Sequence, residues 1–515
     1  MTGSKGVLLV LDGWGEGPPG SDNALAAANT PVLDRLRSQY PGPLLAASGS
    51  AVGLPEGVVG NSEIGHLVMG AGRPLEYDSL LVQRQAESGE LRTHPELRRV
   101  CQGLAERGGA LHLVGLCSDG RIHSDIAHFG ELLHGAQASG CPRVWLHAVT
   151  DGRDVADGTA VDYLAQLQKM ADEADAGEYA TVIGRNLAMD KSGRRELTER
   201  ACWLIVDAQE ARAGHDAVSA VAGSASDGDI PPTVIRDYPG VRAGDALLFA
   251  NFRSDRTSPL VGAVHDRLTQ SGRADVELLS LAEYDTRARV TALVHRTDAS
   301  GGLADALEAA RARSVRIAEP EKFEHVTFFI NGRDARRRPY EEHIQVPGTA
   351  GADYTSRPDM NVAQVADRVI EAAGRDDVPL VIANLANIDV VGHTGDYAAT
   401  VKAAEATDLA VERICAAARE QGRWVLLVGD HGNAEQMAKT GPDGSRRPYG
   451  GHTHNPVPCV LVPSAGQRLV TRLPDTSETL PSVAPTVLDL LGIPIPVTIS
   501  APSLLSTSGR TETKD

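Results

Sequence analysis

The chain has 515 residues, of which 42% are hydrophobic, and it carries a formal net charge of −18 at pH 7. This length accommodates two or more domains, and the hydrophobic content excludes an intrinsically disordered chain. The negative charge argues against nucleic acid as a partner, whereas a local cluster of arginines can still bind an anionic small molecule.

The N-terminal segment has an apolar run of only five residues before Asp12, which is too short for a signal peptide or a membrane span. No later run approaches the ~18 apolar residues that a membrane helix requires. The six cysteines show no paired spacing and are expected to be free thiols in a reducing compartment. We therefore expect a soluble, cytoplasmic and monomeric protein with no membrane partner.

Short apolar runs alternate along the chain with longer stretches of helical periodicity, which is typical of α/β proteins. Strands are predicted, in chain order, at 6–13, 111–120, 144–152, 246–252, 379–389 and 424–433, and helices at 25–39, 159–175, 361–373 and 400–420. Nearly all the strands run into Asp, Asn or Gly, so the residues of a site are expected beyond their carboxyl ends. Segments 73–80 and 297–303 are candidate hinges.

Residue types that bind metals occur at four separated places. They comprise three carboxylates and three imidazoles, to which one serine hydroxyl can be added: Asp12, Asp389, His393, Asp430, His431, His452 and Ser62. This mixed oxygen and nitrogen set suits two divalent ions such as Mn²⁺ or Zn²⁺, and it suits calcium poorly because calcium prefers oxygen ligands alone. Asp389 and His393 are four residues apart, so a helical turn would direct both at one ion. Taken singly, such a pair is more often a loop ion pair or a helix cap.

Ser62 lies in the stretch "VVGNSEIGH" (58–66). Three roles are open for it, namely a turn residue, a helix N-cap or a nucleophile. A serine hydroxyl is a poor nucleophile at its ordinary pKa, and coordination to a metal can activate it. Two ions can also stabilise the entering and leaving oxygens of an in-line phosphoryl displacement. The ligand residues elsewhere favour the nucleophile, and Gly60 and Gly65 would then let the backbone approach an anion.

A series of motifs spreads over almost the whole chain: "VGLPEGVVGNSEIGHLVMGAGR" (52–73), "SDGRIHS" (118–124), "TDGRD" (150–154), "NFRSDR" (251–256), "RIAEPEKFEHVTFF" (316–329), "VGHTG" (391–395), "DHGNAE" (430–435) and "HTHNPVP" (452–458). This series resembles the cofactor-independent phosphoglycerate mutases. The resemblance implies an α/β fold whose alkaline-phosphatase-like metal domain, three layers around a mostly parallel sheet, comprises residues 1–77 and 300–515. An α/β phosphotransferase domain, residues 78–299, would be inserted into it and would close onto it during catalysis.

The resemblance also implies roles for single residues. One metal would be held by Asp389, His393 and His452, and the other by Asp12, Ser62, Asp430 and His431. Ser62 would accept the phosphoryl group as a phosphoserine and so interconvert 3-phosphoglycerate and 2-phosphoglycerate without 2,3-bisphosphoglycerate. The two ions are expected to be Mn²⁺, with Mg²⁺, Co²⁺ or Zn²⁺ as alternatives. The positions that match the family's substrate-binding residues are His123, Arg153, Asp154, Arg185, Lys191, Arg253, Arg256 and Lys322.

Three segments depart from the family pattern, whereas every position assigned to the metals or the nucleophile matches it. The stretch "GRNLAMDK" (184–191) lacks two aromatic residues, and Lys191 stands where the family has an arginine, whose planar fork binds anions bidentately. Residues 331–358 and 440–451 differ as well. These changes fit a diverged but ordinary mutase. They also fit a homologue that transfers a phosphonoformyl group from a nucleotide-activated donor to a glycerate-type acceptor, and less well a phosphatase or a non-catalytic binding protein.

Overall fold

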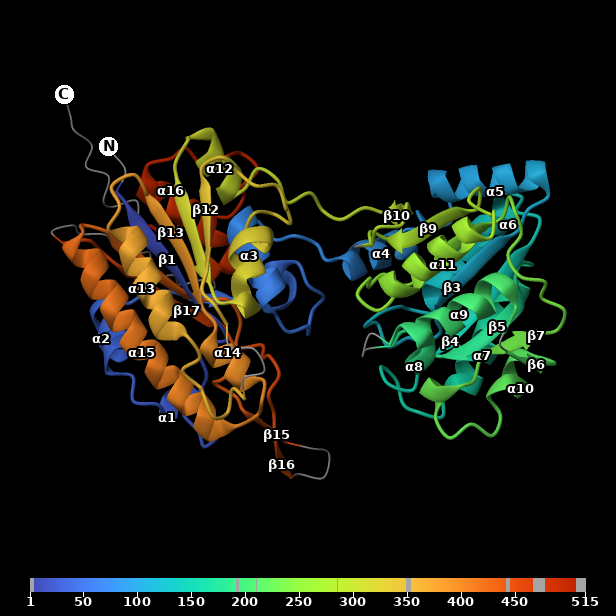
Figure 1. Ribbon diagram of the computed structural model, residues 1–515, viewed down its shortest axis with the longest axis horizontal. Coiled ribbons are helices and arrows are strands. Elements are labelled where there is room, and N and C mark those ends of the chain that lie inside the picture. The colour runs from blue at the N-terminus through green and yellow to red at the C-terminus, as the bar shows by residue number, and fades with distance from the viewer. Residues whose placement is uncertain are drawn as a thin grey trace. The chain divides into compact units, whose positions relative to one another are not determined.

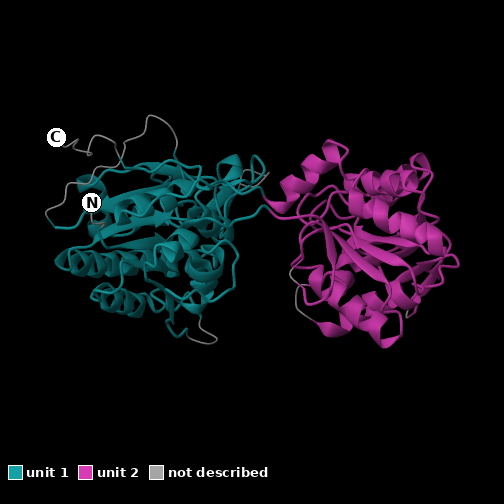
Figure 2. Cartoon of the chain, turned by 90° about the horizontal axis from the view of Figure 1, so that it is seen from above, with its two compact units in different colours: residues 1–76, 297–515 teal, residues 77–296 magenta. Residues whose placement is uncertain are grey.

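The computed structural model describes residues 4–190, 194–209, 211–284, 286–348, 353–440, 445–465 and 478–505, so Lys191 lies outside the described residues. The chain divides into two compact units (Figure 2): unit 1 comprises Met1–Glu76 and Thr297–Asp515, and unit 2 comprises Tyr77–Arg296. The first boundary lies within segment 73–80, and the second lies immediately before segment 297–303.

Unit 1 is built around one large sheet (Figure 1). Its eight strands lie in the order β12-β11-β13-β1-β14-β17-β2-β18. The strands are β1 (Gly6–Leu11), β2 (Leu44–Ala46), β11 (Ser314–Ala318), β12 (Glu341–Gln345), β13 (Leu380–Leu385), β14 (Trp424–Gly429), β17 (Val457–Val462) and β18 (Glu478–Thr479). Four neighbouring strands, β11, β13, β1 and β14, are parallel, and β17 runs antiparallel to β14. The residues of β1, β13 and β14 are buried throughout, as expected for strands covered on both faces.

Helices cover both faces of this sheet (Figure 1). One group packs around α15 and consists of α1 (Ala24–Ala27), α2 (Pro31–Gln39), α13 (Val362–Ala373), α14 (Asn387–Gly392) and α15 (Tyr397–Glu420). The other consists of α3 (Ser62–Ala71), α12 (Leu303–Ala309) and α16 (Val483–Leu491). A short hairpin, β15 (Ala438–Thr440) with β16 (Arg446–Pro448), lies outside the sheet.

The predicted single helix over 25–39 is wrong, because the structure has two helices there. Thr30 precedes Pro31 and has non-helical backbone angles of φ −120° and ψ 59°. Proline disfavours the α conformation in the residue before it, but it is well suited to the first position of a helix. The chain therefore breaks before Pro31 and starts a new helix at that residue.

Unit 2 is a second α/β unit with eight strands in the order β10-β9-β8-β3-β4-β5-β7-β6. The strands are β3 (Leu111–Leu116), β4 (Val144–Thr150), β5 (Glu178–Gly184), β6 (Arg212–Gly214), β7 (Thr233–Ile235), β8 (Ala246–Phe249), β9 (Glu277–Ala282) and β10 (Thr291–Val294). The neighbouring strands β8, β3, β4 and β5 are parallel. The helices are α4 (Asp78–Glu87), α5 (Pro95–Arg107), α6 (Ala127–Ala138), α7 (Ala160–Glu173), α8 (Arg185–Ala188), α9 (Arg195–Asp207), α10 (Ala217–Val221) and α11 (Ser258–Gln270).

The α/β class is confirmed, and each of the six predicted strands is present. Each ends a few residues earlier than predicted, so the polar residues come just after the strand. The predicted helices at 159–175, 361–373 and 400–420 correspond to α7, α13 and α15. Each of the six cysteines lies within the described residues and is a free thiol. The described part of the chain holds no helix whose length and apolar character would let it cross a membrane.

Candidate active site

The candidate active site of unit 1 lies at the carboxyl ends of its four neighbouring parallel strands. Asp12 follows β1 directly, and Asp430 follows β14 directly. Asp389 lies on α14 just after β13, and Lys322 ends a single 3₁₀ turn, η3 (Pro320–Lys322), after β11. Because parallel strands end at one edge of a sheet, residues from four distant parts of the chain meet there. His452 arrives at the same edge because β17, which follows it, is antiparallel to β14.

Ser62 is the first residue of α3 and is 5% exposed. Its neighbour Asn61 is the N-cap, whose side chain accepts a hydrogen bond from the backbone N–H of Ile64. The N-cap role is therefore taken, and the hydroxyl of Ser62 faces charged groups instead. Ser62 Oγ lies 3.2 Å from Asp12 Oδ1 and 2.8 Å from His431 Nε2.

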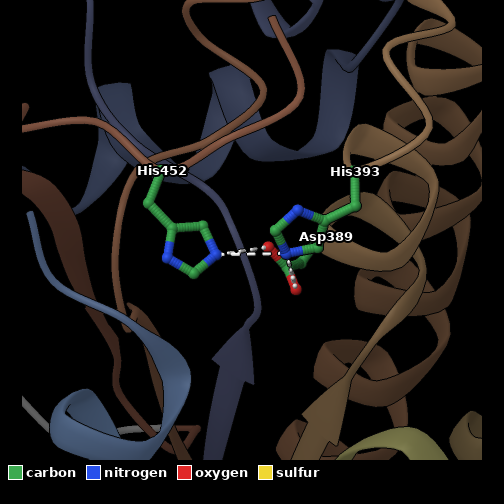
Figure 3. A group of neighbouring side chains, drawn as sticks. All are labelled: Asp389, His393 and His452. Atoms are coloured by element: carbon green, nitrogen blue, oxygen red, sulfur yellow. Dashed lines mark hydrogen bonds and ion pairs between the residues drawn. The ribbon is translucent and has the colours of Figure 1, made fainter. Parts of the chain in front are cut away.

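One cluster of candidate metal ligands consists of Asp389, His393 and His452, and Figure 3 shows both imidazoles turned toward the carboxylate. The Nε2 atoms of His393 and His452 lie 3.4 Å and 3.5 Å from the Asp389 oxygens. The Nδ1 atoms face backbone carbonyls, that of Gly450 at 2.7 Å for His393 and that of Gly60 at 2.9 Å for His452. Such contacts require Nδ1 to carry the proton, which leaves the Nε2 lone pairs free for a cation.

This arrangement fits a bound cation. The Nε2 atoms of His393 and His452 are only 3.1 Å apart. In neutral imidazoles with the proton on Nδ1, neither Nε2 has a hydrogen to donate to the other. A divalent ion placed between the two imidazole nitrogens and the carboxylate would give all three groups a partner. Borderline metals bind such mixed nitrogen and oxygen ligands.

The second cluster consists of Asp12, Asp430 and His431, which are fully buried. Within the described residues, Asp430 Oδ2 has no hydrogen-bond partner. Burial, with the negative charge of Asp12, raises the pKa of Asp430 well above its ordinary value. Burying a carboxylate without a partner is energetically unfavourable, and a bound cation would compensate its charge. This carboxylate therefore fits a metal site.

Lys322 lies between the two clusters. Its Nζ donates to Ser62 Oγ at 2.6 Å, to Asp12 Oδ1 at 2.7 Å and to Asp389 Oδ2 at 2.7 Å. Burial opposes the ammonium charge, but the surrounding carboxylates outweigh burial and raise the pKa of Lys322. The lysine is therefore charged and bonds directly to the serine hydroxyl, which makes it part of the candidate site of unit 1.

Two residues that were not singled out from the sequence connect Ser62 to Asp12. The Asn384 amide donates to Asp12 Oδ2 at 2.6 Å and lies 3.1 Å from His66 Nε2. His66 Nδ1 in turn lies 2.8 Å from the backbone carbonyl of Ser62, and burial lowers the pKa of His66 to about 4. A neutral His66 that donates from Nδ1 accounts for both contacts. The sequence did offer one signal for Asn384, because it is a polar residue within the otherwise apolar strand 380–385.

The structure gives Gly60 and Gly65, which were interpreted as room for an anion, a role in packing. A Cβ on Gly60 would lie 2.0 Å from the carbonyl oxygen of Ala47, and one on Gly65 would lie 2.7 Å from that of Asp430. The two glycines allow close approach of the protein's own backbone. Gly65 thereby seats α3 against Asp430.

Unit 2 holds a polar cavity of about 460 Å³. It is lined by six of the substrate-binding residues predicted for this unit: His123, Arg153, Asp154, Arg185, Arg253 and Arg256. These residues follow β3, β4, β5 and β8, which are neighbours in the sheet. The carboxyl ends of the parallel strands therefore build this cavity too.

The floor of the cavity is fixed by Asp151, another residue missed from the sequence. Asp151 forms an ion pair with Arg185 and accepts the backbone N–H groups of Arg153 and Asp154 at 3.1 Å and 3.0 Å. Arg185 also contacts Asp154 at 2.9 Å. Burial opposes ionisation of Asp151, but the hydrogen bond from the Ser118 hydroxyl, together with those from the Asp154 N–H and Arg185, lowers its pKa. Arg185 is thus held by two carboxylates, which compensate the cost of burying its charge.

The rim of the cavity is more open. Arg253 and Arg256 share one carboxylate, Asp255, at 3.0 Å and 3.4 Å. His123 Nδ1 lies 3.6 Å from the same residue, and burial lowers the pKa of His123. Asn186, one of the two positions that depart from the family's aromatics, bonds Asp229 at 2.8 Å on the cavity wall.

Comparison with known proteins identifies the class first. The Metalloenzyme superfamily model matches residues 4–495. The chain is 57% identical over 491 residues to the 2,3-bisphosphoglycerate-independent phosphoglycerate mutase of Streptomyces coelicolor, covering 95% of each chain. It is 40% identical over 514 residues to the enzyme of that name from Synechococcus sp. strain JA-3-3Ab, covering 97% of this chain and 95% of the relative.

Solved structures agree with the sequence relatives. The crystal structure of Leishmania mexicana phosphoglycerate mutase at low cobalt concentration matches with a TM-score of 0.72 and 29% identity, covering 98% of each chain. The fold and the clusters of ligand residues thus define a metalloenzyme. Within that class, the chain belongs to the 2,3-bisphosphoglycerate-independent phosphoglycerate mutase family of enzymes.

Proposed function

We propose that this enzyme interconverts 3-phosphoglycerate and 2-phosphoglycerate without 2,3-bisphosphoglycerate, through a phosphoserine at Ser62. One observation carries the proposal: the hydroxyl of Ser62 lies within 3.2 Å of a charged lysine, a histidine and a carboxylate, between two clusters of metal-ligand residues. Family membership supplies the substrate class. No capping or turn role of Ser62 requires such surroundings.

Asp389, His393 and His452 would hold one divalent ion, and Asp12, Ser62, Asp430 and His431 the other. We propose Mn²⁺, with Mg²⁺, Co²⁺ or Zn²⁺ as alternatives, because the donors mix carboxylate oxygen with imidazole nitrogen. When bound, the ions supply Lewis acidity, which lowers the pKa of the serine hydroxyl and stabilises charge on the transferring phosphoryl group.

The side chains would move the proton and the phosphoryl group as follows. Ser62 Oγ loses its proton toward Asp12 Oδ1, which lies 3.2 Å away and whose carboxylate has lone pairs for both an ion and a proton. Oγ forms a bond to phosphorus while the bond from phosphorus to the glycerate oxygen breaks, and that oxygen takes a proton. The other glycerate hydroxyl then gives its proton to the same base and attacks the phosphorus of the phosphoserine, and the bond from phosphorus to Oγ breaks. The Lys322 ammonium stabilises negative charge on Oγ in both steps.

For unit 2 we propose binding of the anionic substrate. Its cavity presents several guanidinium groups, which suit carboxylate and phosphate oxygens. The buried Arg185 would fix the orientation of the substrate, and the more open pair Arg253 and Arg256 would adapt to either phosphoglycerate isomer. Lys191 would contribute a further positive charge.

The test is an enolase-coupled assay with 3-phosphoglycerate on protein loaded with Mn²⁺, in the absence of 2,3-bisphosphoglycerate. We expect turnover, and we expect mass spectrometry of acid-quenched protein to find phosphate on the peptide containing Ser62. An enzyme with full metal occupancy that is inert toward 3-phosphoglycerate would overturn the proposal. Turnover of a CMP-linked phosphonoformyl donor by that same enzyme would replace it with the transferase alternative.

A further inference from the structure

The five residues Tyr449–Thr453, here called the clasp, connect hairpin β15–β16 to β17. Hydrogen bonds hold both ends of the clasp to neighbouring backbone. The N–H of Tyr449 donates to the carbonyl of Met437 at 2.9 Å, and the N–H of Thr453 donates to that of Gly432 at 3.1 Å. Between these ends the clasp provides both His452 and the carbonyl of Gly450, which accepts the Nδ1 hydrogen of His393 at 2.7 Å. The clasp therefore sets the positions of two of the three ligands.

The middle of the clasp is a pair of glycines that cannot carry side chains. A Cβ on Gly450 would lie 2.7 Å from the carbonyl oxygen of His393, and one on Gly451 would lie 2.5 Å from the hydroxyl of Tyr449. Glycines lose more conformational freedom on ordering than other residues, so this segment needs contacts from outside to hold it.

The side chain of Tyr449 provides such a contact. Its hydroxyl reaches past Gly451 and donates to the carbonyl of His452 at 2.8 Å. Lys439 Nζ lies 3.6 Å from the centroid of the tyrosine ring, a cation–π distance. The ring of Tyr449 is thus held by Lys439 of β15, and its hydroxyl bonds the backbone of the same segment at His452.

We propose that Tyr449 is a positioning residue for the metal cluster of Asp389, His393 and His452. Its hydroxyl holds the backbone of 450–452 so that the Nε2 atoms of His393 and His452 converge on the carboxylate. Groups that orient ligands without touching the metal tune affinity in this way. The inference rests on the metal assignment of the proposed function.

The test is calorimetric titration of Mn²⁺ into metal-free protein, with Tyr449→Phe compared with wild type. The substitution removes one hydroxyl and keeps the ring against Lys439. We expect wild type to bind two ions, and the variant to bind one of them about 3- to 10-fold more weakly, as loss of one hydrogen bond implies. The melting temperature in EDTA should stay at the wild-type value, which separates weaker ligand positioning from loss of folding.

The matched control is Tyr397→Phe, which removes a hydroxyl that donates to the carbonyl of Asn23 at 3.2 Å in the same unit. Both of its Mn²⁺ constants should equal those of wild type. Lys439→Met, which removes the cation over the ring, should weaken the same site as Tyr449→Phe by a smaller factor. Wild-type constants in Tyr449→Phe, or equal weakening of both sites, would overturn this inference alone. A wild-type protein that binds fewer than two ions would overturn the proposed function together with it.

Discussion

The two units place charged groups at the same location in their sheets but use them differently. In unit 1, Asp12, Asp430 and His431 are 0% exposed, and Lys322 bonds three partners within 2.7 Å. In unit 2, the side chains of Arg253 and Arg256 are 44% and 27% exposed and share one carboxylate. Charges interact more strongly where water is excluded. Unit 1 therefore holds a buried and closely bonded set of charges, whereas the charges at the rim of the unit 2 cavity are more exposed and are screened by solvent.

The largest effect is expected at the nucleophile. Ser62→Ala removes the group that would accept the phosphoryl, and we expect a loss of about 10⁴-fold or more in kcat, as for other covalent nucleophiles. The enolase-coupled assay measures it. Ser48→Ala, which removes an exposed hydroxyl bonded to the carbonyl of His454, is the control and should retain wild-type activity. A Ser62→Ala enzyme with a tenth of the wild-type rate would refute the phosphoserine route.

The next effect tests how strongly the buried charges of unit 1 depend on one another. Lys322→Met removes the cation from Asp12 and Asp389, and breaking a buried pair costs about 3–5 kcal/mol. We expect that loss in the free energy of urea unfolding in EDTA, and we expect Mn²⁺ to restore most of it by supplying positive charge. Lys5→Met, which breaks an exposed pair with Asp376, should change stability little. Equal losses with and without Mn²⁺ would show that the lysine does not share its carboxylates with the metals.

The buried ion pair of Arg316 and Glu341 lies outside both candidate sites. It therefore tests how much a buried charge pair contributes to stability where no metal or substrate is involved. Burial disfavours the Glu341 carboxylate, but Arg316 and neighbouring hydrogen bonds lower its pKa from 4.5 to about 2. A lowered pKa stabilises the fold above pH 4.5, and this stability is lost as pH falls through about 2. Glu341→Gln should therefore cost about 2–3 kcal/mol at pH 7, and the difference from wild type should shrink on acidification.

Urea unfolding of wild type and variant at a series of pH values measures this difference. The adjacent Glu342→Gln is the control, because Glu342 pairs with Arg375 at a half-exposed position. Its cost should stay small at every pH. A Glu341→Gln penalty that did not change with pH would mean that the carboxylate charge contributes nothing.

The smallest effect is expected at the rim of the unit 2 cavity. Arg253→Gln removes one exposed guanidinium, and we expect KM to rise about 10-fold, near 1.4 kcal/mol, with kcat and unfolding free energy almost unchanged. The wild-type KM should also rise with added salt, because exposed charges are screened. Arg195→Gln, which removes an 89% exposed arginine that pairs with Glu199 outside this cavity, is the control. A large fall in kcat in Arg253→Gln would place this arginine in the reaction itself.

The sequence by itself determined the strands and the residues that follow them. Buried parallel strands are continuous apolar runs, and Asp12 and Asp430 stand where such runs stop, so both could be read without a structure. The motif series led in the same way to the family, which the comparisons confirm. One local prediction was wrong, because the helix expected over 25–39 breaks before Pro31. The close backbone packing at Gly60 and Gly65 was not foreseen.

The tertiary structure alone decided which charges meet. Lys322 is 260 residues from Ser62 in sequence, yet its ammonium bonds the serine hydroxyl, because β11 lies two strands from β1 in the sheet. The roles of Asp151, Asn384 and His66 depend on distances that no spacing in the chain encodes. The hydroxyl of Tyr449 likewise reaches His452 only because the intervening glycine leaves room for it. Sequence specifies elements and their chemistry through local propensity, whereas strand order decides which elements become neighbours.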